Sequence, residues 1–134
     1  RMILVDTSVW IEVLKDKTGK VVAAFKKMTG SGTPVLTRFN QLELLQGAKG
    51  QQEWRLLDDY LATQYYLEAS NDTWREAARI YFDLRRLGVT INSPIDCCIA
   101  RIAMEHDALL LHRDKDFEHV SRIRPLHQAR FDWR

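Results

Sequence analysis

Five acidic residues occupy positions at which carboxylates are able to form one site. Each lies near the end of an expected strand or helix, or on a helix face with room beside it; they are Asp6, Glu43, Asp96, Asp114 and Asp116. Two unit charges about 4 Å apart repel by on the order of 4 kcal/mol at an effective dielectric constant of about 20. A cluster of carboxylates is therefore stable only when protons or a cation compensate its charge.

The chemistry of this ligand set favours a hard divalent cation. Oxygen ligands without histidine or thiolate at metal-binding spacing suit Mg²⁺ or Mn²⁺, which keep several waters and share coordination with phosphate oxygens. Such an ion activates water and neutralises charge that develops on a phosphodiester. The acidic residues therefore indicate metal-dependent phosphodiester hydrolysis.

Each acidic residue also has a purely structural interpretation. Asp6 is able to cap a helix, Asp96 to complement a helix dipole, and Glu43 to be a solvated helix position. Asp114 or Asp116 is able to cap the short helix that begins there. Their joint placement at consistent positions favours one shared site over four independent coincidences, when Asp114 and Asp116 are counted as one position.

Alternating strands and helices must position these residues. The apolar run 2–5 has no polar alternation, which is typical of a strand buried on both faces of a parallel sheet. Asp6 follows it, at the strand end where ligand sites gather in open α/β sheets. We expect further strands at 35–37, 65–67, 108–111 and near Pro125 and Leu126, and helices at 7–15, 20–28, 39–48, 51–63, 72–87, 94–106 and 117–120.

This element order predicts an α/β fold, a three-layer α/β/α sandwich around a mainly parallel sheet of about five strands. The chain has 134 residues, of which 46% are hydrophobic, and this suffices for one domain over residues 1–134 but not for two. The net charge of +2 permits a nucleic-acid partner without requiring one.

Two further features bear on where the protein works. Cys97 and Cys98 are adjacent, and neighbours in sequence rarely form a relaxed disulfide, so we expect a reducing, cytoplasmic setting. No apolar run approaches the length of about 18 residues that a membrane helix needs, so we expect no membrane segment.

The ordered set of short motifs resembles a known family, the PIN-domain ribonucleases of the VapC toxin type. The resemblance covers nearly the whole chain. It rests on residues 4–10 (LVDTSVW), on Glu43 followed by Gly47, on residues 93–96 (SPID) with Ala100 and Ala103, and on residues 110–117 (LLHRDKDF).

The resemblance implies a single PIN-like nuclease domain in which Asp6, Glu43 and Asp96 bind Mg²⁺ or Mn²⁺. It places the fourth acid of the family at Asp114 or Asp116 and leaves open which of the two is the primary ligand. It also implies that a hydroxyl beside Asp6, from Thr7 or Ser8, orients a carboxylate or water. The implied partners are an RNA substrate, a cognate antitoxin protein and a second copy in a homodimer, with a larger toxin–antitoxin assembly beyond it.

Other residues have weaker assignments. Five basic residues are candidates for an RNA path, although solvated helix ends explain them equally well: Arg38, Arg85, Arg86, Arg113 and Lys115. His112 is more readily explained as a packing residue than as a proton carrier. Exposure of Trp54 or Tyr60 would indicate an interface.

Three other functions compete with this interpretation. A receiver-type Mg²⁺-binding signalling domain also has strand-end aspartates, but it needs an acidic pair after the first strand, where this chain has Thr7 and Ser8. A catalytically silent PIN-like binding module would bind metal without turnover. A DNA substrate in place of RNA is compatible with the sequence.

Overall fold

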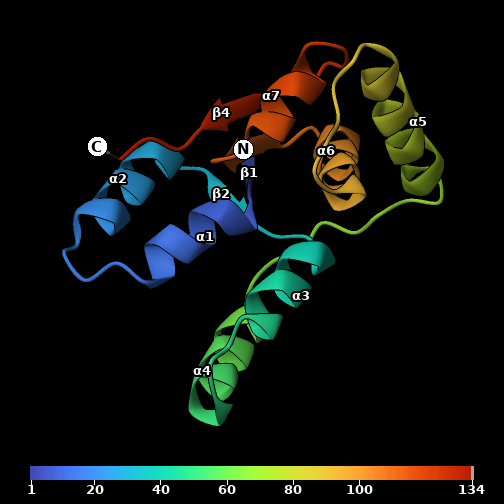
Figure 1. The fold of residues 1–134 in the computed structure, drawn as a ribbon. Coiled ribbons are helices and arrows are strands. Elements are labelled where there is room, and N and C mark those ends of the chain that lie inside the picture. Colours follow the sequence, from blue (N-terminus) through green and yellow to red (C-terminus); the bar gives the residue numbers. More distant parts are fainter. Residues whose placement is uncertain (134) are drawn as a thin grey trace.

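The structure, a computed structural model, describes residues 1–133 and contains a parallel sheet with helices on both faces (Figure 1). The strands are β1 (Met2–Val5), β2 (Thr33–Val35), β3 (Leu109–His112) and β4 (Gln128–Arg130), in the order β2-β1-β3-β4 across the sheet. The helices are α1 (Thr7–Leu14), α2 (Lys20–Thr29), α3 (Arg38–Gln46), α4 (Gln51–Ala62), α5 (Thr73–Arg86), α6 (Pro94–Glu105) and α7 (Lys115–Ser121). The predicted α/β sandwich is therefore confirmed.

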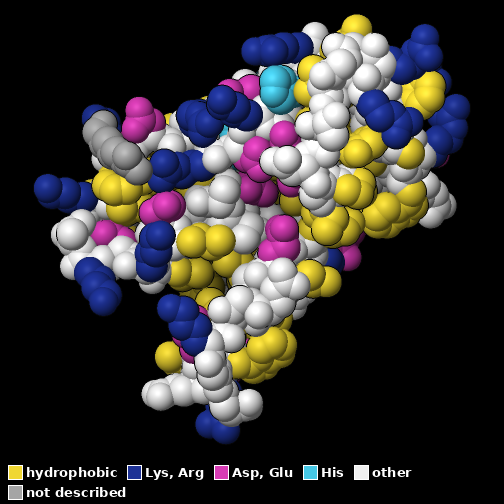
Figure 2. Space-filling view, in the orientation of Figure 1, with side chains coloured by type: hydrophobic (Ala, Val, Ile, Leu, Met, Phe, Trp, Pro, Cys, Tyr) yellow, Lys and Arg dark blue, Asp and Glu magenta, His cyan; other side chains and the backbone are white. Residues whose placement is uncertain are grey.

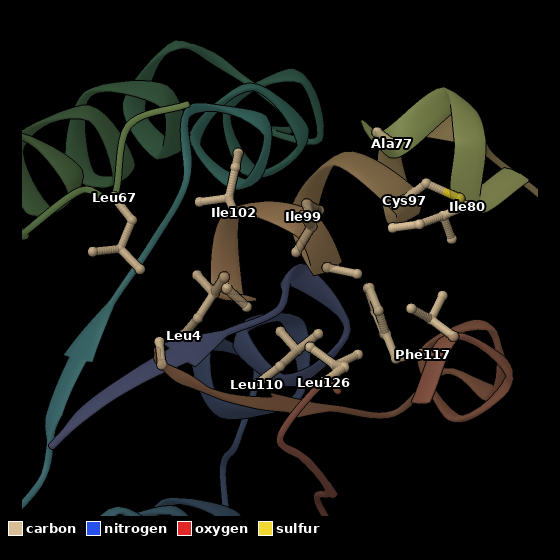
Figure 3. Packing of buried hydrophobic residues seen from close by; sticks show 14 of the residues in the cluster. Leu4, Leu67, Ala77, Ile80, Cys97, Ile99, Ile102, Leu110, Phe117 and Leu126 are labelled. Carbon is tan, nitrogen blue, oxygen red and sulfur yellow. The ribbon is translucent and has the colours of Figure 1, made fainter. Parts of the chain in front are cut away.

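The two central strands are buried on both faces because alternate side chains enter different cores. Leu4 and Leu110 pack with residues of α5, α6 and α7, as Figure 3 shows for this cluster. Ile3, Val5 and Leu111 pack on the other face with residues of α1 and α2. The apolar runs of β1 and β3 thus fix the strand ends between two helical layers.

The parallel pairing brings the ends of β1 and β3 together. Val5 lies opposite Leu111, and the backbone N–H of Asp6 donates to the Leu111 carbonyl at 2.9 Å, one residue beyond β1. The loops that follow both strands therefore begin at the same edge of the sheet. This edge is where α/β folds place their ligand sites.

The sheet has four strands among the described residues, where the sequence predicted about five. The segment predicted as a strand at 65–67 forms only an isolated parallel bridge between Leu36 and Tyr66. Pairing stops there because Leu36 lies beyond the end of β2 and Thr37 already caps α3. A single bridge at the sheet edge does not make a full strand.

Two strand positions are also shifted from the prediction. The second strand is Thr33–Val35, not 35–37. The last strand is Gln128–Arg130, not the segment near Pro125 and Leu126, because proline has no N–H for a ladder and the Leu126 side chain enters the core instead.

α3 and α4 form a helical hairpin that extends away from the sheet (Figure 1). A groove of about 620 Å³ lies between this hairpin and α1. Ile11, Leu14 and Leu56 line it and are largely exposed, and Glu43 borders it. The hairpin thus brings an apolar surface next to one of the five acidic residues.

No described helix is long and apolar enough to cross a membrane. Cys97 and Cys98 are both free, as expected for neighbours in sequence, and Cys97 is buried in the core beside α5 and α6.

Candidate active site

Asp6 and Asp114 follow the two central strands, and each caps the helix that comes next. Asp6 accepts hydrogen bonds from the Ser8 N–H at 3.0 Å and the Ser8 hydroxyl at 2.6 Å, at the start of α1. Asp114 accepts from the Asp116 N–H at 2.9 Å, at the start of α7. Asp6 and Asp114 therefore do cap helices, which is the structural role that the sequence analysis gave as an alternative. The two caps also hold both carboxylates at the sheet edge where β1 and β3 end.

Three carboxylates converge at this edge. Asp96, Asp114 and Asp116 each offer an oxygen, and these oxygens lie within 4.8 Å of one another. Ser93 caps α6 and Pro94 begins it, which places Asp96 in the first turn, facing α7. Figure 2 shows the acidic side chains gathered near the centre of the visible face, between α1, α6 and α7.

Asp96 has a strongly raised pKa. Burial, a hydrogen bond with Asp116 and the charges of Asp114, Asp6 and Asp116 together raise its pKa to about 8, with burial the largest cause. Without a cation this shift favours the protonated form of Asp96, which donates to Asp116. Asp116 is itself buried and accepts a second hydrogen bond from the Asn92 N–H at 3.1 Å.

Asp6 and Glu43 lie outside this cluster of three. Asp6 interacts with Asp114 of the cluster, and Glu43 interacts with Asp6. Burial raises the pKa of Asp6, and the charge of Asp114 raises it further, while the hydrogen bonds from Ser8 oppose the shift. Burial also raises the pKa of Glu43, with a smaller contribution from the charge of Asp6. The five acidic residues thus form one electrostatically connected set across four elements of the chain.

Two hydroxyls beside Asp6 each hold a different carboxylate. The Thr7 hydroxyl donates to Glu43 at 2.8 Å, across the gap between α1 and α3. The Ser8 hydroxyl, which donates to Asp6, also accepts from the Arg113 N–H at 3.0 Å. Ser8 therefore connects the loop after β3 to the loop after β1.

Asn40 supports Glu43 through Thr7, a role that the sequence analysis missed. The Asn40 amide donates to the Thr7 hydroxyl at 3.0 Å, and its carbonyl oxygen accepts from the N–H and the hydroxyl of Thr37, both at 2.8 Å. Asn40 and Thr37 are fully buried. The available signal was the Thr37-to-Asn40 capping spacing, one helical turn before Glu43.

The sequence of this chain matches that of a known family. The PIN domain family matches residues 3–123 of the chain. The chain belongs to the PIN domain family. Ribonuclease VapC11 of Mycobacterium tuberculosis is 34% identical over 134 residues, covering 97% of this chain and 99% of that protein.

Two solved structures share the fold of this PIN domain. VapBC2 from Rickettsia felis, bound to a DNA fragment from their promoter, has a TM-score of 0.79 at 18% identity and covers 98% of this chain and 100% of that chain. VapBC-5 from Mycobacterium tuberculosis, a member of the VapBC family of toxin-antitoxin systems, has a TM-score of 0.64 at 17% identity, with 97% of each chain covered. Membership in the PIN domain family makes the receiver-type alternative wrong.

The carboxylates of the PIN domain fit a hard divalent cation. Asp96, Asp114 and Asp116 supply only oxygen ligands, and the charges of its neighbours help to raise the pKa of Asp96, which favours a proton on its carboxyl group. A cation would replace that proton and relieve the repulsion. This donor set excludes the thiolate and imidazole chemistry that favours zinc.

His112 is a packing residue of the PIN domain that also positions Asp114. It is fully buried against Phe117, with ring centroids 5.2 Å apart. Its Nδ1 accepts from the Asp114 N–H at 3.0 Å, so its Nε2 carries the hydrogen and donates to Gln128 at 2.6 Å. The packing interpretation from the sequence is therefore confirmed.

Replacing Asn40 by alanine should lower both the stability and the activity of the PIN domain. The change leaves two buried donors of Thr37 without their acceptor and removes the donor that holds Thr7, so we expect unfolding free energy to fall by about 1–3 kcal/mol. Chemical denaturation checks this. Gln46→Ala, at the exposed end of the same helix, is the control and should change stability little. Equal stability of the two variants would contradict the role of Asn40.

Proposed function

We propose that this protein is a metal-dependent endoribonuclease that hydrolyses RNA phosphodiester bonds and acts as the toxin of a toxin–antitoxin pair. The observation that carries the proposal is the convergence of Asp96, Asp114 and Asp116 at the carboxyl ends of parallel strands. The relative VapC11 is named a ribonuclease, and VapBC-5 belongs to toxin-antitoxin systems. A single domain in the cytoplasm is part of the proposal, supported by the two free cysteines.

In this proposal Asp96, Asp114, Asp116 and Asp6 hold Mg²⁺ or Mn²⁺. When bound, the cation lowers the pKa of water and neutralises charge on the phosphate. Asp116 is buried and held by the Asn92 N–H, so it serves as the fixed member of the set. Asp114 is held by its own helix cap and by His112.

Glu43 orients the attacking water and takes its proton. The Thr7 hydroxyl fixes one of its oxygens at 2.8 Å, and its raised pKa brings it closer to neutral, where a general base is most effective. The water oxygen then forms a bond to phosphorus while the bond from phosphorus to the leaving ribose oxygen breaks, and that oxygen takes up a proton from solvent. Glu43 lies half-buried at the rim, between the acidic cluster and the groove beside α1.

The groove between α1, α3 and α4 is the proposed binding site of the antitoxin. Its apolar lining includes Ile11, Leu14 and Leu56, which are 48%, 44% and 66% exposed. Trp54 and Tyr60 on α4 are also about two-fifths exposed, which supports an interface at this hairpin. A bound segment there would cover Glu43 and so inhibit cleavage. The homodimer and a larger toxin–antitoxin assembly stay predictions.

Cleavage of a mixed RNA pool tests the proposed function. Antitoxin-free protein with Mg²⁺ or Mn²⁺ should produce discrete RNA fragments. These fragments should be lost with EDTA, which removes the cation, and in Asp6→Asn, which removes one of its ligands. Single-stranded and duplex DNA of matched sequence are run beside the RNA. Intact RNA in every lane, from folded protein that binds metal, would contradict the proposal and support the silent binding module; cleavage of DNA alone would contradict the assignment of substrate.

A further inference from the structure

The outer face of α5 carries arginines and an aromatic ring in one line. Arg75, Arg79, Phe82 and Arg86 follow each other at three- and four-residue intervals, which places them on one side of the helix, and all four are exposed. Arg85 lies beside them. We call these five residues the α5 stripe, and Figure 2 shows the basic side chains around α5 at the upper right of the molecule.

The charge of the α5 stripe is only partly neutralised. Arg79 pairs with Asp83 at 2.9 Å, and Arg75 pairs with Glu76 at 3.4 Å. None of the ion pairs among residues 1–133 involves Arg85 or Arg86. The end of α5 therefore concentrates positive charge in a chain whose net charge is only +2.

Phe82 gives the α5 stripe an apolar platform framed by cations. Its side chain is 38% exposed. The guanidinium carbons of Arg79 and Arg86 lie 5.0 and 5.8 Å from the centre of its ring. An exposed ring between cations suits a stacked base whose flanking phosphates need neutralisation, which is how proteins bind single-stranded nucleic acid.

The basic end of the α5 stripe leads directly to the acidic cluster. α5 ends at Arg86, and the segment 87–93 runs from there to the start of α6. Within that segment the Asn92 N–H donates to Asp116, and Ser93 caps the helix that carries Asp96. The stripe and the candidate active site are therefore joined by a short, anchored connection.

Two of the other basic candidates from the sequence, Arg38 and Arg113, are engaged elsewhere, whereas Lys115 is exposed at the start of α7. Arg38 lies on the Tyr66 ring, 3.9 Å from its centre, and pairs with Glu68 at 3.2 Å. Arg113 pairs with Glu12 at 3.4 Å. In the described part of the chain, Arg85 and Arg86 are exposed and contact only aromatic rings, those of Tyr81 at 5.7 Å and Phe82 at 5.8 Å, so their charge differs from that of Arg38 and Arg113 in having no carboxylate partner.

We propose that the α5 stripe binds the single-stranded RNA substrate outside the acidic cluster, with phosphates on Arg85 and Arg86 and a base stacked on Phe82. This inference rests on the proposed function, because it assigns a second contact to the same substrate. The simpler explanation is that two arginines in the last turn only complement the dipole of α5. The two explanations differ in what they predict for RNA affinity.

RNA binding without cleavage separates them. The Asp96→Asn protein is titrated with a fluorescent single-stranded RNA over a range of salt concentrations, alone and combined with R85Q/R86Q. Loss of two phosphate contacts should weaken binding about tenfold at low salt and make the slope of log Kd against log salt shallower by about 1.4. R85K/R86K should restore the slope, because lysine keeps the charge.

The matched control is K26Q/K27Q, which removes two exposed basic residues from the last turn of α2, on the other side of the molecule (Figure 1). It should leave RNA affinity and slope close to those of the parent. Phe82→Leu should weaken binding without changing the slope, because it removes stacking and no charge. Equal affinity and slope for R85Q/R86Q and K26Q/K27Q would overturn the inference. Since this assay needs no turnover, it is read independently of whether the parent protein cleaves RNA.

Discussion

Asp96→Asn should lower RNA cleavage by about 10³-fold or more, while the protein stays folded, because groups that act as a unit fail together. Asp96 lies in a cluster whose oxygens are within 4.8 Å of one another, and its carboxylate accounts for one of the charges that would hold the cation. Asparagine keeps the shape but offers a neutral ligand. Initial rates at saturating Mg²⁺, with folding checked by circular dichroism, measure the effect.

Asp107→Asn is the matched control for this change. Asp107 is exposed, follows the opposite end of the same helix and has a φ of 51°, a conformation that asparagine adopts readily. Asp107→Asn removes one carboxylate charge, as Asp96→Asn does, but it removes that charge outside the site. We expect its activity to equal that of the parent protein. Activity retained in Asp96→Asn would show that this residue has no part in the mechanism. Equal losses of activity in both variants would show that the loss follows from the change in net charge and not from the site.

Metal-free protein should become less stable as the pH rises from about 4 to about 8. Burial and neighbouring carboxylates raise the pKa of Asp96 to about 8, far above the ordinary value of 3.8, so the folded state binds a proton that the unfolded state releases. The stabilisation is complete below the ordinary pKa and is lost as the pH passes the folded pKa, with a slope of up to about 1.4 kcal/mol per pH unit from one group. Asp6 and Glu43, whose pKa values are also raised, add to the same trend.

Chemical denaturation in EDTA between pH 5 and pH 8.5 measures this slope. Asp96→Asn should flatten it and should be more stable than the parent protein at pH 8, because its amide still donates to Asp116 without carrying a charge. Added Mg²⁺ should reverse that order, since the intact site binds the cation in the folded state. A parent protein whose stability in EDTA is independent of pH over this range would show that the carboxylates do not repel one another as the cluster requires.

Local pattern was sufficient to predict most of the fold. The strand at 2–5 and the helices predicted at 72–87 and 94–106 depend on neighbours in sequence, and each forms within one residue of its predicted ends. The strand predicted at 65–67 does not form, because a strand needs a neighbour that pairs with it over several residues. Its neighbour β2 ends at Val35, which only the assembled sheet decides.

The amino-acid sequence by itself determined which carboxylates are candidates for the site, because carboxylates at strand ends and in first turns are visible in the order of the chain. Only the tertiary structure decided how they act together. Asp96, Asp114 and Asp116 meet because α6 and α7 pack on the same face of the sheet. Glu43 instead is held beside Asp6 by the hydroxyl of Thr7, which accepts a hydrogen bond from the buried Asn40. Distances between residues far apart in sequence, and the burial that raises the pKa of Asp96, arise from packing, which no local pattern contains.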